Sequence, residues 1–153
     1  MSAPTLKESI RTELTAAMKA GDKVKLGTLR MLTTAIVNRE KEVLHELSDD
    51  EVREVAAREM KRRSESIEAF ERGGRSDLVA KETAERDLLS VYAPEQLSEA
   101  EVDTLIEEAI ATTGATGLKE MGRVMGAVMA EAKGAVDGAA VQAKVRVRLE
   151  GSG

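Results

Sequence analysis

The chain has 153 residues, of which 42% are hydrophobic and 33% charged, a composition typical of a folded protein of one or two small domains. Its 23 basic and 28 acidic residues give a net charge of −5, which argues against a protein that coats nucleic acid or anionic membranes without specificity. Aromatic residues make up only 1% and cysteine is absent, which excludes a disulfide framework, a thiolate zinc site and a cysteine nucleophile and disfavours a β-sandwich.

Four helices are predicted within residues 1–93. Thr5, Asp22 and Ser48 can each accept hydrogen bonds from the free N–H groups of a following turn, and Ser76 starts the fourth helix. Gly21 is expected to end the first helix in the left-handed conformation. The apolar positions expected to face the core are Leu6, Ile10, Leu14, Ala17 and Met18, then Leu26, Leu29, Thr33, Ile36, Val37 and Val43 or Leu44, then Val52, Val55, Ala56, Met60, Ile67 and Phe70, and finally Leu78, Leu88, Leu89 and Val91.

Three shorter helices are predicted within residues 98–150. Ser98 and Glu101 have the spacing of a capping box, Gly114 interrupts the pattern, and Asp137 caps the last helix. The expected core positions are Val102, Leu105, Ile106, Ala109 and Ile110, then Leu118, Met121, Val124, Met125, Val128 and Met129, and finally Val141, Val145 and Leu149. Because no strand pattern is convincing, we expect an all-α fold of seven helices.

The segment around Pro94 is the best candidate for a linker, because a residue before proline avoids the helical conformation. We therefore expect an N-terminal bundle of long helices in residues 1–93, a linker in residues 94–97 and a small three-helix domain in residues 98–150. A unit as small as the second has a marginal core, and we expect it to lean on the first unit or on a partner. With no signal-peptide pattern and no long apolar window, the expected location is the cytoplasm.

No recognised catalytic or metal-binding motif is present. The sequence has no glycine-rich phosphate loop of the GxGxxG or GxxxxGK[ST] type, no EF-hand loop and no HExxH pattern. His45, the single histidine, falls at a predicted helix end, where an ordinary structural role is expected. We therefore expect no catalytic residue, no metal and no cofactor, and a protein that acts by offering a surface.

Two surfaces are candidates. On the third predicted helix, Arg58, Lys61 and Arg62 could share a face that meets phosphates. The alternative is a solvated face of ion pairs four residues apart, namely Glu54–Arg58, Glu59–Arg63 and Glu68–Arg72. The second surface combines small and methionine side chains, which favours either a tight helix contact or a groove for a partner helix; its residues are Met121, Gly122, Met125, Gly126 and Met129.

Several blocks, in one order along nearly the whole chain, resemble the stand-alone YqeY-like proteins. They are TLRML and AIVNRE within residues 28–40, RRSESIEAFERGGRSDL at 62–78, YAPEQLS at 92–98 and a stretch within 121–138. The last part of that family is similar to the tail domain of the GatB subunit of the tRNA-dependent amidotransferase, a domain that contributes to tRNA binding. Here Gly126, Glu131 and Ala135 stand where the family commonly has basic residues.

This resemblance implies an all-helical, two-part fold. Together with the glycine and methionine face of residues 118–133, it leaves three readings of function. The first is a non-catalytic accessory module that contacts tRNA, or a tRNA-aminoacylation or amidation assembly, by shape and backbone. The second is a protein-interaction module that binds a helix or a second copy. The third, which follows the family label, is a carbon–nitrogen ligase with glutamine as the amide-nitrogen donor. The residues expected to contact RNA are Arg58, Lys61, Arg62, Arg75, Lys119, Arg123 and Lys133.

Overall fold

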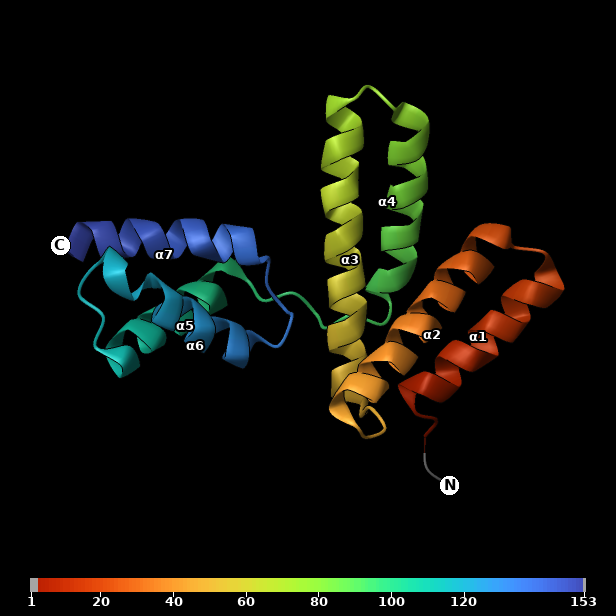
Figure 1. The fold of residues 1–153 in the computed structure, drawn as a ribbon, viewed down its shortest axis with the longest axis horizontal. Helices are drawn as coiled ribbons and strands as arrows, with labels where there is room; N and C mark the ends of the chain where they lie inside the picture. The colour runs from red at the N-terminus through yellow and green to blue at the C-terminus, as the bar shows by residue number, and fades with distance from the viewer. Residues whose placement is uncertain (1–2, 153) are drawn as a thin grey trace. The chain divides into compact units, whose positions relative to one another are not determined.

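The computed structural model describes residues 3–152, and within them it contains seven α-helices, one 3₁₀ turn and no strand (Figure 1). The all-α prediction is confirmed. The contacts divide the chain into two compact units, Met1–Pro94 and Glu95–Gly153, which we call unit 1 and unit 2 and describe separately. Unit 1 contains α1 (Leu6–Ala20), α2 (Lys23–Val43), α3 (Asp49–Arg72) and α4 (Ser76–Ser90), and unit 2 contains α5 (Glu99–Thr113), the 3₁₀ turn η1 (Leu118–Glu120), α6 (Met121–Ala132) and α7 (Gly138–Ser152).

Unit 1 consists of two helical hairpins, α1–α2 and α3–α4, that share one core (Figure 1). The core contains aliphatic side chains from all four helices and the ring of Tyr92 after α4. Its buried members are Ile10, Leu29, Leu32, Ile36, Leu47, Val52, Val55, Ala56, Leu89 and Tyr92. Burial of this set on one side of each helix leaves the charged faces in solvent, as the apolar spacing predicts.

The predicted caps of unit 1 are present. The hydroxyl of Thr5 and the carboxylate of Asp22 each accept a backbone N–H three residues later, at 3.1 Å in both cases. Ser48 forms a full capping box, in which the Glu51 side chain also accepts the Ser48 N–H at 3.0 Å. Gly21 ends α1 at φ 71°, where a side chain would be strained. Local hydrogen bonds therefore set these boundaries.

The predicted core face of α2 is partly wrong. Thr33 and Val37 are exposed, whereas Thr28 and Leu32 are buried. The buried Thr28 hydroxyl donates to the Val24 carbonyl at 2.9 Å, so its burial leaves no unpaired polar group. Because α1, α3 and α4 all pack on α2, the arrangement of its neighbours decides which stripe is covered, and several stripes have similar spacing.

Three other expected core positions of unit 1 are also exposed. Met18 is 52% exposed, Leu44 87% and Val91 75%. Val91 lies outside because α4 ends at Ser90, and the next turn buries Tyr92 instead. Val43, the alternative to Leu44, packs against the core.

Unit 2 has its own apolar core, formed by α5, α6 and α7. The predicted positions Val102, Ile106, Val124, Val128, Val141, Val145 and Leu149 are all buried there. Ser98 and Glu101 form the predicted capping box, and Asp137 accepts the Ala139 N–H at 3.1 Å at the start of α7. Leu118 differs from the prediction: it lies in η1 and is 46% exposed. No helix among the described residues has the length and apolar character needed to cross a membrane.

Candidate functional site

The seven predicted RNA-contacting residues divide between the two units. Unit 1 carries four of them on α3 and at the α3–α4 turn, and unit 2 carries three on η1, α6 and its end. These residues form two candidate surfaces, one on each unit. The first contains Arg58, Lys61, Arg62 and Arg75, and the second Lys119, Arg123 and Lys133.

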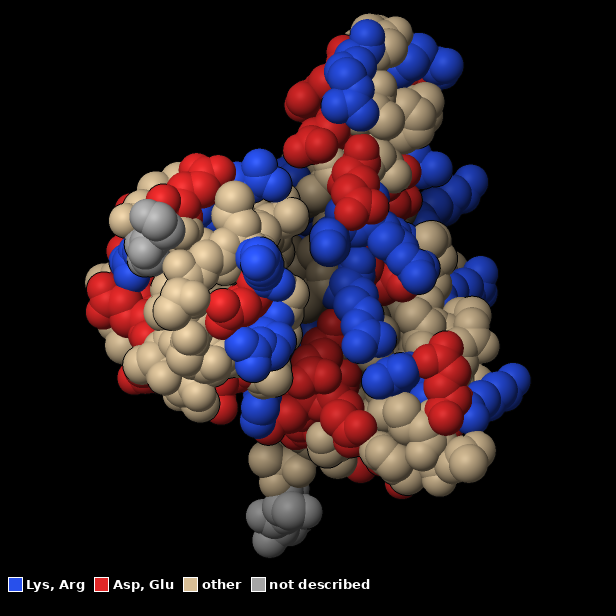
Figure 2. Space-filling model, turned by 60° about the vertical axis from the view of Figure 1, so that its left-hand side comes forward, with Lys and Arg blue, Asp and Glu red and all other residues tan. Residues whose placement is uncertain are grey.

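The basic surface of unit 1 centres on α3. Arg58 and Lys61 are exposed, and neither has a carboxylate partner among the described residues. Arg62 is also exposed, although its Nη1 atom lies 3.3 Å from Glu59 Oε1. Figure 2 shows basic side chains gathered along the middle of unit 1, with acidic side chains above and below them. This surface could therefore meet an anionic partner in spite of the overall negative charge.

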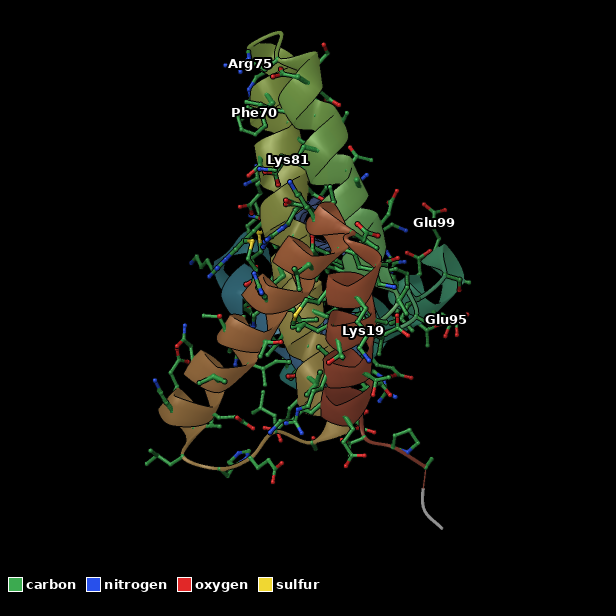
Figure 3. All side chains as sticks on the ribbon, turned by 90° about the vertical axis from the view of Figure 1, so that its right-hand side faces the viewer. Lys19, Phe70, Arg75, Lys81, Glu95 and Glu99 are labelled. Atoms are coloured by element: carbon green, nitrogen blue, oxygen red, sulfur yellow. The ribbon has the colours of Figure 1, made fainter. Side chains whose placement is uncertain are left out.

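Arg75 lies apart from that surface, at the far end of the α3–α4 hairpin, where Figure 3 labels it above Phe70. Its Nη2 atom is 3.3 Å from Asp77 Oδ2, and this guanidinium is the main cause that lowers the pKa of Asp77 below its ordinary value. An anion at Arg75 would therefore compete with Asp77. We call Arg58, Lys61 and Arg62 the α3 basic surface.

One cation near this surface was missed by the sequence analysis. Arg30 on α2 is exposed and has no acidic partner among the described residues. Its neighbour Met31 accepts a hydrogen bond from Arg63 of α3 at 3.3 Å, which brings this turn of α2 next to the middle of α3. The contact joins residues 32 positions apart, so no local spacing could have revealed it.

Beneath the α3 basic surface lies a buried charge cluster. Arg63 Nη1 lies 2.6 Å from Glu59 Oε2, and Arg63 Nε lies 3.5 Å from Glu85 Oε2 on α4. The expected Glu59–Arg63 pair is thus confirmed, but in the interior instead of on a solvated face. The other two expected pairs, Glu54–Arg58 and Glu68–Arg72, do not form within residues 3–152. Arg63 therefore lies in the interior between α3 and α4, with its Nε atom buried and without a hydrogen bond to any described residue, and it is not part of the exposed basic surface.

In unit 2 the cations lie around α6. Lys119 and Lys133 are exposed and without acidic partners in the described part of the chain, and Lys133 ends α6 at φ 48°. Arg123 Nη2 is 2.9 Å from Glu120 Oε2. The Thr116 backbone N–H first, and the Arg123 guanidinium after it, lower the pKa of Glu120, so Arg123 is partly neutralised by a firmly ionised carboxylate.

The face of α6 that carries Gly122 and Gly126 is exposed. A Cβ atom added at either position would meet nothing within 4 Å. The expected tight helix contact at these glycines is therefore wrong among the described residues, and the partner groove stays a prediction. Met121 and Met125 pack partly against the core of unit 2, and Met129 is half-buried.

A hollow in unit 1 brings together a few polar groups between α1, α2 and the end of α4. Lys25 Nζ and Glu13 Oε2 form an ion pair there at 2.7 Å, and the hydrogen bond to Glu13 is the main cause that raises the pKa of Lys25. Burial, followed by the nearby Glu13 carboxylate, raises the pKa of Tyr92, so its hydroxyl stays protonated at neutral pH. Leu29 and Leu88 form part of the apolar wall of this hollow.

Metal-binding chemistry has no support in the described residues. No group of three or more His, Asp or Glu side chains there is arranged to hold a metal ion. His45 follows the end of α2, with Nε2 3.5 Å from Glu51 Oε2 and Nδ1 2.9 Å from the Glu46 carbonyl oxygen. The structural role expected for the single histidine stays a prediction.

These features define a small all-α protein with two helical units, exposed basic side chains and an exposed glycine-containing helix face. The model of the family described as "Yqey-like protein" matches residues 7–149, and the chain belongs to this family. The resemblance to YqeY-like proteins is thereby confirmed across nearly the whole chain.

Two fungal relatives carry the name "Altered inheritance of mitochondria protein 41, mitochondrial". The chain is 34% identical to the protein of Pyrenophora tritici-repentis over 140 residues, which covers 90% of this chain and 77% of the relative. It is 31% identical to the protein of Eremothecium gossypii over 120 residues, which covers 73% of this chain and 65% of the relative.

Proposed function

We propose that the chain is a non-catalytic binding module that contacts tRNA through the α3 basic surface. The observation that carries the proposal is that Arg58 and Lys61 are exposed and have no carboxylate partner within the described part of the chain. Arg63 on the same helix is buried and paired with Glu59 instead. Each phosphate contact releases counterions, so a few free cations can bind RNA even on an acidic protein. The chain belongs to the YqeY family. The resemblance of the last part of that family to the GatB tail domain motivates tRNA as the ligand, whereas the choice of α3 rests on the exposed cations of unit 1 alone.

Recognition would rest on RNA shape and backbone. Readers of single-stranded RNA stack bases on aromatic side chains. This chain has one phenylalanine and one tyrosine; Tyr92 is buried in the core, and Phe70 is half-buried. Cationic side chains on a helix can instead follow the phosphates of a folded RNA, and such contacts are sensitive to salt and tolerant of sequence.

Binding of purified intact tRNA at low and moderate salt tests the proposal. The double variant Arg58→Glu/Lys61→Glu should weaken binding by at least about tenfold and reduce the slope of affinity against salt by about two contacts. The matched control is Arg11→Glu/Lys19→Glu on α1, which changes the net charge equally at exposed cations that also lack acidic partners in the described chain. Equal losses in both variants, or no complex at low salt, would refute it.

A second candidate function is a protein-interaction module, favoured by the exposed face of α6. Gly122 and Gly126 leave the helix backbone open there, and Met129 beside them can adapt to a partner. A partner helix or a second copy of the chain would fit this surface. Light scattering over a range of protein concentrations tests self-association. A Gly126→Leu variant should no longer self-associate, because its side chain would cover the exposed helix backbone.

The family label offers a third reading, a carbon–nitrogen ligase that takes its amide nitrogen from glutamine. Such an enzyme needs a nucleophile with an activating base and a site for ATP. Glutaminase activity that stays with the purified chain through a second ion-exchange step would favour this reading over the binding module. The cytoplasmic location stays a prediction, and imaging of a tagged chain would distinguish it from the mitochondrial location in the names of the two relatives.

A further inference from the structure

A methionine on the surface of unit 1 contacts a buried cation. The side chain of Met31 on α2 is 48% exposed, yet its Sδ atom accepts a hydrogen bond from Arg63 Nη2 at 3.3 Å. The Arg63 side chain is 6% exposed; its Nη1 atom donates to Glu59 Oε2 at 2.6 Å, and its Nε atom lies 3.5 Å from Glu85 Oε2 without a hydrogen bond. Solvent thus reaches the residue that carries the sulfur, while the donor beside it is held in place.

We propose that Met31 is a site of reversible oxidation whose sulfoxide oxygen accepts a hydrogen bond from Arg63 and strengthens the contact between α2 and α3. The oxidant is a hydroperoxide, with hydrogen peroxide as the simplest case. The sulfur lone pair attacks one peroxide oxygen and the O–O bond breaks. A proton then passes from the new S–OH group to the departing hydroxide, which gives one sulfoxide and one water. The inference concerns a different residue from the proposed RNA contacts and does not depend on them.

The two oxidation states differ in their strength as acceptors. A thioether sulfur is a weak acceptor, whereas a sulfoxide is polar and presents an oxygen to the donor. Hydrogen bonds from a guanidinium to an oxygen are short and strong. The methionine side chain has three rotatable bonds and its half-exposed position leaves room, so it can withdraw enough to place the oxygen beside Nη2.

Met18 provides a matched control within the same unit. It lies on α1 and is 52% exposed, close to the value for Met31, but its sulfur has no hydrogen-bond donor among the described residues. Its sulfoxide would simply face water. Peroxide should therefore reach both residues, while only the product at Met31 gains a protein partner.

The experiment compares the wild-type chain with the variants Met18→Leu and Met31→Leu before and after brief treatment with hydrogen peroxide. Peptide mass spectrometry measures oxidation at each methionine, and the reaction is stopped before the four half-buried ones react. Unfolding of unit 1 is followed by the fluorescence of Tyr92, since the chain has no other tyrosine and no tryptophan. Oxidised Met18→Leu should melt about 2–5 °C higher than before treatment, and a methionine sulfoxide reductase should reverse the shift.

The melting temperature of the Met31→Leu variant should not increase after treatment with hydrogen peroxide. Met31→Gln gives a second test without peroxide, because its amide oxygen can also accept from Arg63; it should melt higher than Met31→Leu. The proposal is overturned if Met31 stays reduced while Met18 is fully oxidised, if oxidation at Met31 leaves the midpoint unchanged or lowers it, or if the Gln and Leu variants melt at the same temperature.

Discussion

Arg63 Nη1 lies 2.6 Å from Oε2 of Glu59, one turn earlier on α3, and both side chains are less than a tenth exposed. The same guanidinium also faces Glu85 of α4, so α3 and α4 share a buried charge cluster. Such a cluster is sensitive to the loss of Glu59, because the buried Arg63 then keeps only the longer contact to Glu85 and its charge is poorly compensated.

Replacement of Glu59 by alanine should therefore destabilise unit 1 by about 3 kcal/mol. Urea unfolding followed by Tyr92 fluorescence measures the change. Glu65→Ala is the matched control, since Glu65 is an exposed residue of the same helix without an acid–base partner among the described residues, and it should change stability by less than about 0.5 kcal/mol. Similar values for the two variants would show that the pair contributes no more than an exposed glutamate.

The capping box at the start of α5 gives a second prediction. The Ser98 hydroxyl accepts the Glu101 N–H at 3.1 Å, and the Glu101 carboxylate accepts the Ser98 N–H at 3.2 Å. Ser98→Ala should destabilise unit 2 by about 1 kcal/mol, and Ser98→Asp, which retains an acceptor, by much less. Hydrogen exchange of the first turns of α5 measures the effect, and equal protection in the two variants would contradict it.

The open glycines give a third prediction, which also bears on the second candidate function. An added Cβ at Gly126 of α6 or Gly27 of α2 meets no atom of the described residues within 4 Å, and both positions are helical. Alanine at either site should stabilise its own unit by roughly 0.5–1 kcal/mol, because alanine loses less backbone entropy than glycine. Thermal unfolding checks both variants.

If a partner helix docks on α6, Gly126→Ala should weaken that association while Gly27→Ala leaves it unchanged. Light scattering of the two variants at matched concentrations distinguishes these outcomes. Identical self-association in both would leave the exposed face of α6 without a docking role.

Glu40 gives a prediction about pH. Its Oε2 atom accepts from Lys7 Nζ at 2.7 Å and from the Leu47 N–H at 2.9 Å, and these two hydrogen bonds, Lys7 first, lower its pKa. A carboxyl whose pKa is lower in the folded chain stabilises the fold above its ordinary pKa of about 4.3 and loses that contribution as the pH falls through the folded value.

Glu40→Gln should therefore be less stable than the wild type at neutral pH, and the difference should shrink below about pH 4. Urea midpoints from Tyr92 fluorescence at a series of pH values measure this convergence. The exposed Glu65→Gln variant provides the control. A difference that stays constant from neutral to acid pH would show that the Glu40 charge does not stabilise the fold.

Helix boundaries could be predicted from the sequence because local hydrogen bonds determine them. Asp22, Ser48 and Ser98 each accept a backbone N–H three residues away, so the relevant partners were already visible in the printed sequence. Gly21 and Gly114 both adopt positive φ at the predicted helix ends. These features need no knowledge of how the helices pack.

The burial of particular side chains was harder to predict, because partners distant in the sequence determine it. Arg63 looked like one member of a basic run, but Glu85, 22 residues later, contributes to its interior position. On α2, Val37 was expected to be buried but is exposed, and Leu32 is buried instead, because the neighbouring helices cover a different stripe of the α2 surface. The α3 basic surface consists of the cations of α3 that remain exposed once Arg63 is buried by its long-range contacts. Its role in RNA binding stays a prediction.

Leu44 occupies a strained backbone position at the end of α2. It ends α2 at φ 63°, a conformation that disfavours side chains, and its own side chain is 87% exposed. Glycine at this position would remove both the backbone strain and an exposed apolar side chain. It would also raise the conformational entropy of the unfolded chain, which partly offsets the gain in stability. Design of a more stable and less aggregation-prone variant of this protein would therefore begin at position 44.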